Sequence, residues 1–226
     1  MTPAALDLLS TGAAHILGRP LAGGEVGPFT KYLELLLKWQ RTQRLVGRSD
    51  PRWIVENLFL DSLLFLTVLP ASAASAADVG SGAGIPGVPI AIVRPDLRVV
   101  LIESRQRRVS FLRTVVRELG LRSVQVSPVR AGDDPAHVAA FDAVVMRCAG
   151  SPAEVVPVAL KLVAPGGVAI LAGPPGRPTD SAGGVEVTES VGGLEAAVER
   201  RGEVARVSDP VRGGERRFLI FRERSE

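Results

Sequence analysis

The sequence predicts an α/β fold with a mostly parallel sheet, an antiparallel C-terminal strand and an N-terminal helical extension. Three observations support this class. Strand and helix patterns alternate from residue 76 to residue 172, a glycine-rich turn follows the first strand, and helical patterns precede it. Such alternation places helices on both faces of a parallel sheet. We therefore expect a helical extension over residues 1–70 and one α/β domain over residues 71–226.

The N-terminal region is expected to contain two helices. A lead over residues 18–28, punctuated by Gly and Pro, precedes Thr30, which is expected to cap a helix running through Leu33 and Leu37. Trp39 in this helix is expected to pack rather than to bind a ligand. The second helix, over residues 54–69, is apolar but too short to span a bilayer, which needs roughly 20 apolar residues.

The α/β region follows a regular order. The helix at 105–119 is the clearest element, because Val109, Leu112, Val116 and Leu119 form one apolar stripe between a Ser104 cap and Gly120. A helix near 192–201 is expected next, followed by an antiparallel hairpin of 203–208 and 216–222 that closes the sheet. The remaining expected elements are strands near 76–80, 98–103, 123–127, 141–147 and 167–172 and helices near 87–93, 134–139 and 153–162.

A glycine cluster stands where the first strand should pass into a helix. It reads Asp78-Val-Gly80-Ser-Gly82-Ala-Gly84. Glycines let a backbone approach a ligand closely, and the amides that open the next helix face the ligand as donors. The order of residues differs from the dinucleotide and triphosphate fingerprints. It resembles motif I of the S-adenosylmethionine-dependent methyltransferases with a Rossmann-like fold, which implies that Asp78, Gly80, Gly82 and Gly84 form the cofactor site.

A second carboxylate stands at the end of the next strand. Glu103 follows the apolar run Val99-Val-Leu-Ile102, where folds of this kind place an acid that accepts the ribose hydroxyls of a bound nucleotide. The alternative is that Glu103 only interacts with the dipole of the following helix.

Composition indicates a protein of the cytoplasm. The chain has 226 residues, one cysteine and no intramolecular disulfide, and no signal peptide is visible at its first residues. His15 and His137 are not at metal-ligand spacing, so no metal is expected.

Two basic segments flank the glycine cluster. Residues 31–52 hold six basic and two acidic residues, and residues 103–122 hold the same numbers. Such faces favour a polyanionic partner, because arginine binds phosphates bidentately, although a run of charge is also typical of a solvated helix face. The candidate RNA-binding residues are Lys38, Arg41, Arg44, Arg105 and Arg108.

A closer resemblance extends over most of the chain. The run from Asp78 through Gly84-Ile-Pro-Gly-Val-Pro89 to Asp96, the segment Glu103-Ser-Arg-Gln-Arg-Arg108, and the short matches at 36–39, 59–62, 141–142 and 214–216 are similar to the glucose-inhibited division protein B family. That family consists of bacterial methyltransferases that act on guanine N7 in small-subunit (16S) ribosomal RNA. The resemblance implies S-adenosylmethionine as cofactor and 16S RNA or the small subunit as partner. A monomer without membrane association is expected.

The resemblance also implies individual contacts. Gly80, Ile85, Ala131, Gly132 and Arg147 are expected to contact the cofactor. The chain departs from the family pattern at four places, which are Arg44-Leu45-Val46, Asn57-Leu58, Gly132 and Ala172.

The chemistry of the target atom agrees with this assignment. Guanine N7 carries a free lone pair, so methyl transfer to it needs positioning and electrostatics but no general base. Arg147, at the end of the fourth strand, is the candidate catalytic residue, and a tether to a phosphate or carboxylate is its alternative role. A nucleophilic Cys148 would indicate pyrimidine C5 chemistry instead. Two other functions remain open, namely a methyltransferase of another substrate and a decayed RNA- or ribosome-binding module of the same fold.

Overall fold

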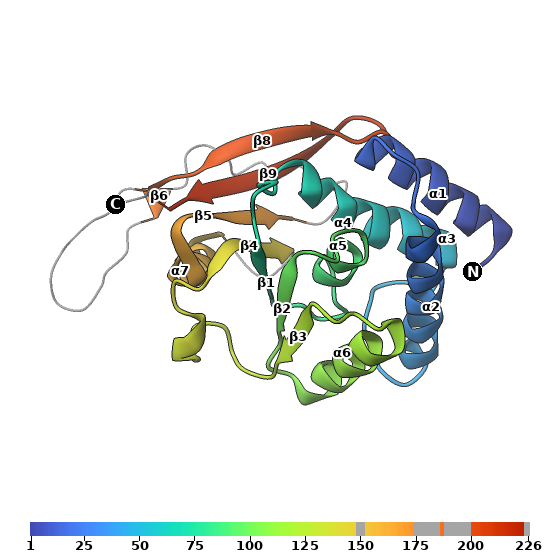
Figure 1. Cartoon of the computed structure of the whole chain (residues 1–226), viewed down its shortest axis with the longest axis horizontal. Coiled ribbons are helices and arrows are strands. Elements are labelled where there is room, and N and C mark those ends of the chain that lie inside the picture. Colours follow the sequence, from blue (N-terminus) through green and yellow to red (C-terminus); the bar gives the residue numbers. More distant parts are fainter. Residues whose placement is uncertain (148–151, 174–185, 188–199, 224–226) are drawn as a thin grey trace, which may run out of the picture.

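A seven-stranded sheet with helices on both faces forms the centre of the molecule (Figure 1). The computed structural model describes residues 1–147, 152–173, 186–187 and 200–223. The strand order is β3-β2-β1-β4-β5-β9-β8, with β1 to β5 parallel and β9 antiparallel to β5 and β8. This confirms the predicted fold class and the closing hairpin. The strands are β1 Ser75–Val79, β2 Arg98–Ile102, β3 Val124–Ser127, β4 Phe141–Arg147, β5 Val163–Ala172, β8 Glu203–Ser208 and β9 Glu215–Arg222.

Successive side chains of the parallel strands point into two different cores. Ala76, Leu101 and Val145 belong to a cluster shared with the N-terminal helices, α5 (Gly87–Val93) and α6 (Gln106–Leu119). Ala77 and Val144 belong to a second cluster under α7 (Pro152–Leu162). Because both faces are buried, β1, β2, β4 and β5 are largely apolar without alternation, whereas the edge strand β3 exposes Gln125.

The N-terminal region differs from its expected boundaries. Helix α1 (Pro3–Leu17) was not predicted, although Thr2 caps it and Gly18 ends it in a left-handed conformation. Helix α2 (Gly23–Gln40) begins before the predicted cap, so Thr30 lies inside the helix. The true start is fixed by Glu25, whose carboxylate accepts the Ala22 N–H at 2.6 Å. An acidic group in the first turn stabilises a helix that glycines and Pro28 would otherwise weaken.

Residues 51–67 are helical throughout but change their hydrogen-bond pattern. The segment passes through α3 (Pro51–Ile54), the π-helical η1 (Val55–Leu60), α4 (Asp61–Leu63) and the 3-10 helix η2 (Leu64–Thr67). The predicted helix over 54–69 is thus confirmed, although the helical segment begins three residues earlier and ends two residues earlier. Its π-helical turn lies directly before Asp61, and such turns occur often at functional sites.

Three other local predictions need correction. The N-cap of α6 is Arg105 rather than Ser104, and the helix buries Phe111 and Val115 with Val109 and Leu112, whereas Val116 and Leu119 are only partly buried. The expected helix near 134–139 is the single 3-10 turn η3 (Pro135–His137). Most of the helix expected near 192–201 lies outside the described residues, but its last two residues form β7 (Arg200–Arg201), because they pair with β6 (Glu186–Val187).

Candidate active site

A loop from Gly80 to Pro86 joins β1 to α5 at the carboxyl edge of the sheet. Gly80, Gly82 and Gly84 have φ angles of 69°, 57° and 87°, which residues with a side chain rarely adopt. The N–H groups of Gly80 and Ser81 donate to the carbonyl oxygen of Ile102 at 2.9 and 3.2 Å. The loop is therefore fastened to the end of β2, next to the second predicted carboxylate.

Asp78 lies beneath this loop and is fully buried. Its Oδ2 accepts the N–H of Gly87, the first residue of α5, at 3.0 Å. Its Oδ1 has no hydrogen-bond partner among the described residues, and burial raises the pKa of the carboxyl to about 7. A Cβ on Gly87 would lie 2.7 Å from Oδ2, so only glycine fits there. Asp78 thus joins β1 to α5 and supports the loop from below.

Glu103 faces the same loop from the end of β2 and is 5% exposed. Its carboxylate accepts the N–H of Gly82 at 3.0 Å and that of Arg105 at 2.9 Å, and Nη1 of Arg108 lies 3.5 Å away. Glu103 therefore holds the backbone of the N-cap residue Arg105 just before α6, while no side-chain hydrogen bond caps the helix. It also meets the glycine loop, as the spacing from Asp78 predicted.

Gly82 lies where the loop meets Glu103 and Arg108. A Cβ built on it would lie 3.6 Å from Nη1 of Arg108, an ordinary van der Waals distance. The positive φ of Gly82, and not a clash, therefore accounts for glycine at this position. A carboxylate suits the hydroxyls of a ribose, and a glycine backbone suits close approach of a nucleoside. These residues fit S-adenosylmethionine.

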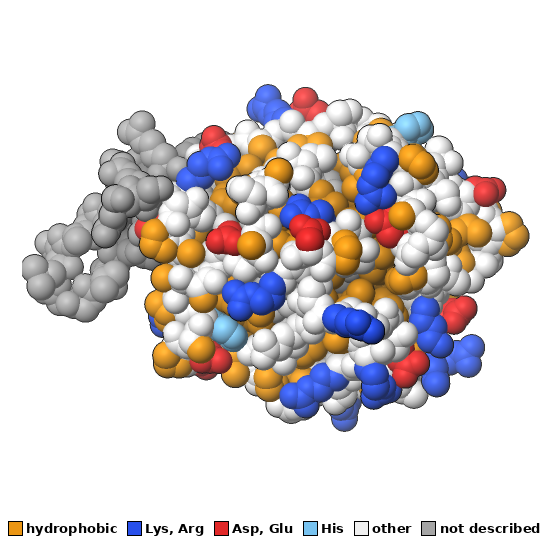
Figure 2. Space-filling view, in the orientation of Figure 1, with side chains coloured by type: hydrophobic (Ala, Val, Ile, Leu, Met, Phe, Trp, Pro, Cys, Tyr) orange, Lys and Arg blue, Asp and Glu red, His pale blue; other side chains and the backbone are white. Residues whose placement is uncertain are grey.

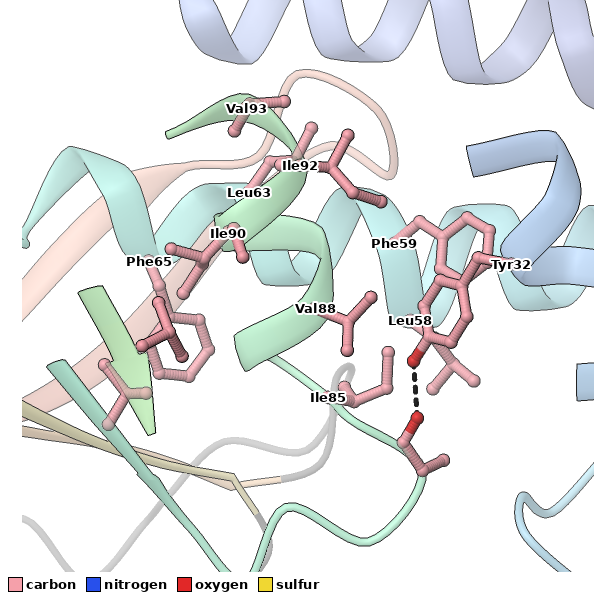
Figure 3. Close-up of a cluster of buried hydrophobic side chains, with 14 of the residues drawn as sticks. Tyr32, Leu58, Phe59, Leu63, Phe65, Ile85, Val88, Ile90, Ile92 and Val93 are labelled. Carbon is pink, nitrogen blue, oxygen red and sulfur yellow. Dashed lines mark hydrogen bonds between the residues drawn. The ribbon is translucent and has the colours of Figure 1, made fainter. Parts of the chain in front are cut away.

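The N-terminal region reaches the loop through Tyr32, which sequence analysis missed. Its hydroxyl donates to the carbonyl oxygen of Ala83, and its ring stacks on Phe59 at 4.9 Å between centroids (Figure 3). Tyr32 is fully buried. No local pattern distinguishes it from any other apolar residue of α2, so only the fold places it at the loop.

Arg147 ends β4 and points toward the N-terminal helical segment. Its Nε donates to Asp61 at 3.0 Å and its Nη2 to the carbonyl oxygen of Asn57 in η1 at 2.8 Å. The side chain is 10% exposed. The structure thus gives Arg147 a carboxylate partner, in line with the tether considered for it, at the carboxyl end of the sheet.

Asp61 is the centre of a buried group of charges. Besides Arg147 it contacts Arg212 at 2.6 Å and Arg216 at 2.9 Å, both from the end of the molecule where β8 turns into β9. Nη2 of Arg216 also donates to the carbonyl oxygen of Gly173, just after β5. Burial and the neighbouring arginines lower the pKa of Arg216. The sequence contains the motif at 214–216 but no local sign of its partner Asp61, because these pairs join residues more than 150 positions apart.

The other candidates occupy separate places. Gly132, with φ of 88°, lies in the turn after β3, and its carbonyl oxygen accepts Nζ of Lys161 at 2.8 Å. Ala131 packs against the second core. Ile85 is buried in the glycine loop, just before the helix that carries Val88 (Figure 3). Cys148 lies outside the described residues.

The candidate RNA-binding residues lie at the surface, and only Arg105 and Arg108 contact Glu103 beside the loop. Lys38, Arg41 and Arg44 are exposed at the end of α2 and just after it, and Arg105 is exposed at the start of α6. Arg108 is half-buried against Glu103. Basic side chains gather on the lower right of the face in Figure 2, over the region of α2 and α6.

The described residues contain no helix that is long and apolar enough to cross a membrane. Within the same residues, no group of three or more His, Cys, Asp or Glu side chains could hold a metal ion.

The fold, with its glycine loop after β1, is that of the Rossmann-like methyltransferases. A S-adenosylmethionine-dependent methyltransferase from Aquifex aeolicus superimposes with a TM-score of 0.52, at 16% identity over 76% of this chain and 93% of its own. The O-methyltransferase TomG from Streptomyces achromogenes, in complex with S-adenosylmethionine, has a TM-score of 0.52 at 18% identity over 88% and 90% of the two chains. At these identities the likeness shows the fold alone.

The sequence defines the family. The model of the GidB family, described as rRNA small subunit methyltransferase G, matches residues 26–173. The Ribosomal RNA small subunit methyltransferase G of Xanthomonas campestris is 34% identical over 224 residues, which cover 97% of this chain and 98% of that protein. The chain belongs to the rRNA small subunit methyltransferase G family, and the resemblance found in the sequence is confirmed.

Proposed function

We propose that the protein transfers the methyl group of S-adenosylmethionine to N7 of a guanine in small-subunit (16S) ribosomal RNA. Membership of the family, over nearly the whole chain, carries the assignment to small-subunit RNA methylation. The pairing of Glu103 with the Gly82 loop supports the cofactor. The free lone pair of guanine N7, which needs no general base, supports the target atom.

The cofactor is held between the ends of β1, β2 and β4 in this proposal. Glu103 accepts the ribose hydroxyls, while the loop of Gly80, Gly82, Gly84 and Ile85 lies along the methionine and ribose. Asp78 acts from below the loop, because it is buried and engaged with α5. The Ala131–Gly132 turn lies on the adenine side.

Arg147 is proposed to lie beside the methyl donor and the guanine. The bound cofactor supplies an electrophilic methyl group on sulfur. The protein contributes orientation and a fixed electrostatic environment, which are the two effects that transfer to a lone pair requires. Asp61 holds the guanidinium of Arg147 in one geometry, so that little reorganisation is needed when the substrate binds.

The assembly state and location follow the same assignment. We propose that the protein is a monomer of the cytoplasm. Size-exclusion chromatography with light scattering tests the assembly state.

Mapping of the modified base tests the function. Small-subunit RNA and whole small subunits, both lacking the modification, are incubated with the protein and S-adenosylmethionine, cleaved chemically at N7-methylguanine and read by primer extension. A new stop at one guanine is the expected result. Methyl transfer that leaves no such stop would assign a different target atom. Binding of RNA without any methyl transfer would indicate a decayed RNA-binding module.

A further inference from the structure

Helices α2 and α6 border an open groove that the proposed chemistry does not use. It has a volume of about 630 Å³, and its lining includes Leu35 and Trp39 from α2 and Thr114 from α6. The ring of Trp39 meets that of Phe111 edge-on, with the centroids 5.5 Å apart. A volume of this size lies in the range of roughly 300–1,000 Å³ that binds single small molecules.

The groove is bordered by basic side chains on both sides. Lys31 and Lys38 line it from α2, and Arg117 lines it from α6. Two acidic side chains, Glu34 and Glu118, line it as well, so the lining carries one more positive than negative charge. Glu118 is paired with Arg117 at 3.0 Å. The remaining positive charge is complementary to a phosphate.

Trp39 adds a flat apolar surface to this basic groove. Its side chain is half-buried, so one edge is held by Phe111 while the indole still lines the groove. Proteins that bind single-stranded nucleic acid combine these two features, since bases stack on aromatic rings and cations contact the phosphates. A peptide partner would not need cations on both sides of the aromatic ring.

The two helices of the groove also border the candidate active site. Tyr32 of α2 contacts the glycine loop at Ala83, and α6 begins beside Glu103. A strand bound in the groove would therefore lie on the same two helices that position the loop. The groove is therefore separate from the cofactor site but shares its two helices.

We propose that the α2–α6 groove binds an unpaired nucleotide of the RNA substrate, with its base against Trp39 and neighbouring phosphates on Lys31, Lys38 and Arg117. The proposal rests on the proposed function, because it takes RNA as the substrate. It assigns Trp39 a role in binding in addition to the packing role expected from the sequence.

Tryptophan fluorescence tests the groove directly. The chain has two tryptophans, so Trp53→Phe leaves Trp39 as the only indole. This variant is titrated with single-stranded octaadenylate and with a duplex of the same length. We expect saturable quenching by the single strand and little quenching by the duplex, because only unpaired bases can stack on the ring. Equal quenching by both, or none by either, overturns the proposal.

A charge-removal pair gives a matched control. In the Trp53→Phe background, Lys38→Ala with Arg117→Ala removes two groove cations, and Arg206→Ala with Arg222→Ala removes two exposed arginines of β8 and β9. The groove variant is expected to bind octaadenylate about fivefold or more weakly. The slope of its log association constant against log salt concentration should be smaller in magnitude than that of the control by about 1.4, which corresponds to two lost phosphate contacts on a single strand. Equal affinities and slopes for the two variants overturn the proposal.

Methyl transfer separates the groove from the proposed function. Trp39→Leu should raise KM for small-subunit RNA about fivefold and leave KM for S-adenosylmethionine unchanged, and Trp39→Tyr should restore most of the RNA affinity.

If all groove variants methylate RNA with wild-type KM, the groove proposal fails and the proposed function stands. If the wild type transfers no methyl group to RNA but the quenching persists, the proposed function fails and the groove stands. Quenching by RNA-free small-subunit proteins but not by RNA would assign the groove to a protein and overturn the proposal.

Discussion

Asp61 and Arg147 form a buried ion pair that joins the N-terminal helical segment to the carboxyl end of β4. Nε of Arg147 lies 3.0 Å from Oδ2 of Asp61, whose side chain is completely buried. Arg212 and Arg216 contact the same carboxylate. One negative charge therefore offsets parts of three positive charges in a region with little access to water, and its removal should be costly.

Asp61→Asn should lower the free energy of unfolding by about 3–5 kcal/mol, because the guanidinium groups would lose a buried counter-charge. Urea denaturation at neutral pH measures the change. Asp96→Asn is the matched control, since Asp96 is 65% exposed and pairs with Arg94 at 2.8 Å. That substitution should cost less than about 1 kcal/mol. Equal losses in the two variants would show that the Asp61 group contributes no more than a surface pair.

Tyr32→Phe should weaken cofactor binding although Tyr32 has no predicted contact with the cofactor. The substitution removes the hydroxyl that holds the Ala83 carbonyl, and so loosens the glycine loop. Stability should fall by about 1 kcal/mol, which is typical for one buried hydrogen bond. Titration calorimetry with S-adenosylhomocysteine should show a several-fold higher Kd.

Ser62→Ala provides the comparison for this prediction. Ser62 is buried, and its hydroxyl also donates to a carbonyl oxygen, but to that of Leu58 in its own helical segment and not to one of the loop. It should cost a similar free energy of unfolding and leave the Kd unchanged. A rise in Kd in both variants would attribute the effect to general loosening.

The strands and the two carboxylates of the site could be predicted because their signals are local. Apolar runs set the strands, and the glycines between Asp78 and α5 mark the loop. The N-terminal boundaries were misplaced because Gly23, Gly24 and Pro28 suggested a loop, whereas the Glu25 carboxylate stabilises a helix start there. Nothing local indicates that Tyr32 meets Ala83.

The ion pairs of Asp61 are an even clearer case of contacts that the local sequence does not indicate. Arg212 lies 151 residues from Asp61 along the chain, and Arg216 lies 155 residues away. Opposite charges at such separations have no periodic pattern, and only the closing hairpin brings them together. The contacts of the candidate site that could not be predicted, those of Tyr32 and Asp61, all join residues far apart in the sequence.

Asp78→Asn should make the stability of the protein less dependent on pH. Burial raises the pKa of Asp78 from 3.8 to about 7, so the folded state holds a proton that the unfolded state has lost between these values. Wild-type stability should therefore fall, relative to the variant, as pH rises from 4 through 7, by about 1.4 kcal/mol per unit of pKa difference at most. Below pH 4 the difference should be constant.

Urea denaturation of both proteins between pH 4.5 and pH 8.5 measures this effect. Asp96→Asn is the control, because Arg94 holds the pKa of Asp96 below its usual value. A lowered carboxyl pKa contributes stability that is lost only as pH falls below this window, so its difference from wild type should stay flat. A flat difference for Asp78→Asn as well would contradict the burial of an uncharged carboxyl.

Glu103→Gln should weaken cofactor binding at least tenfold. The carboxylate is expected to accept ribose hydroxyls while it already accepts the N–H groups of Gly82 and Arg105. Gln has one acceptor oxygen and a donor amide, so one of these N–H groups would face another donor, and hydrogen bonds to a charged group are worth about 1.5–3 kcal/mol. Calorimetry with S-adenosylhomocysteine gives the Kd. Glu215→Gln, at a side chain 56% exposed on β9, should bind like the wild type. A Kd for Glu103→Gln within twofold of that control would show that Glu103 serves only the start of α6.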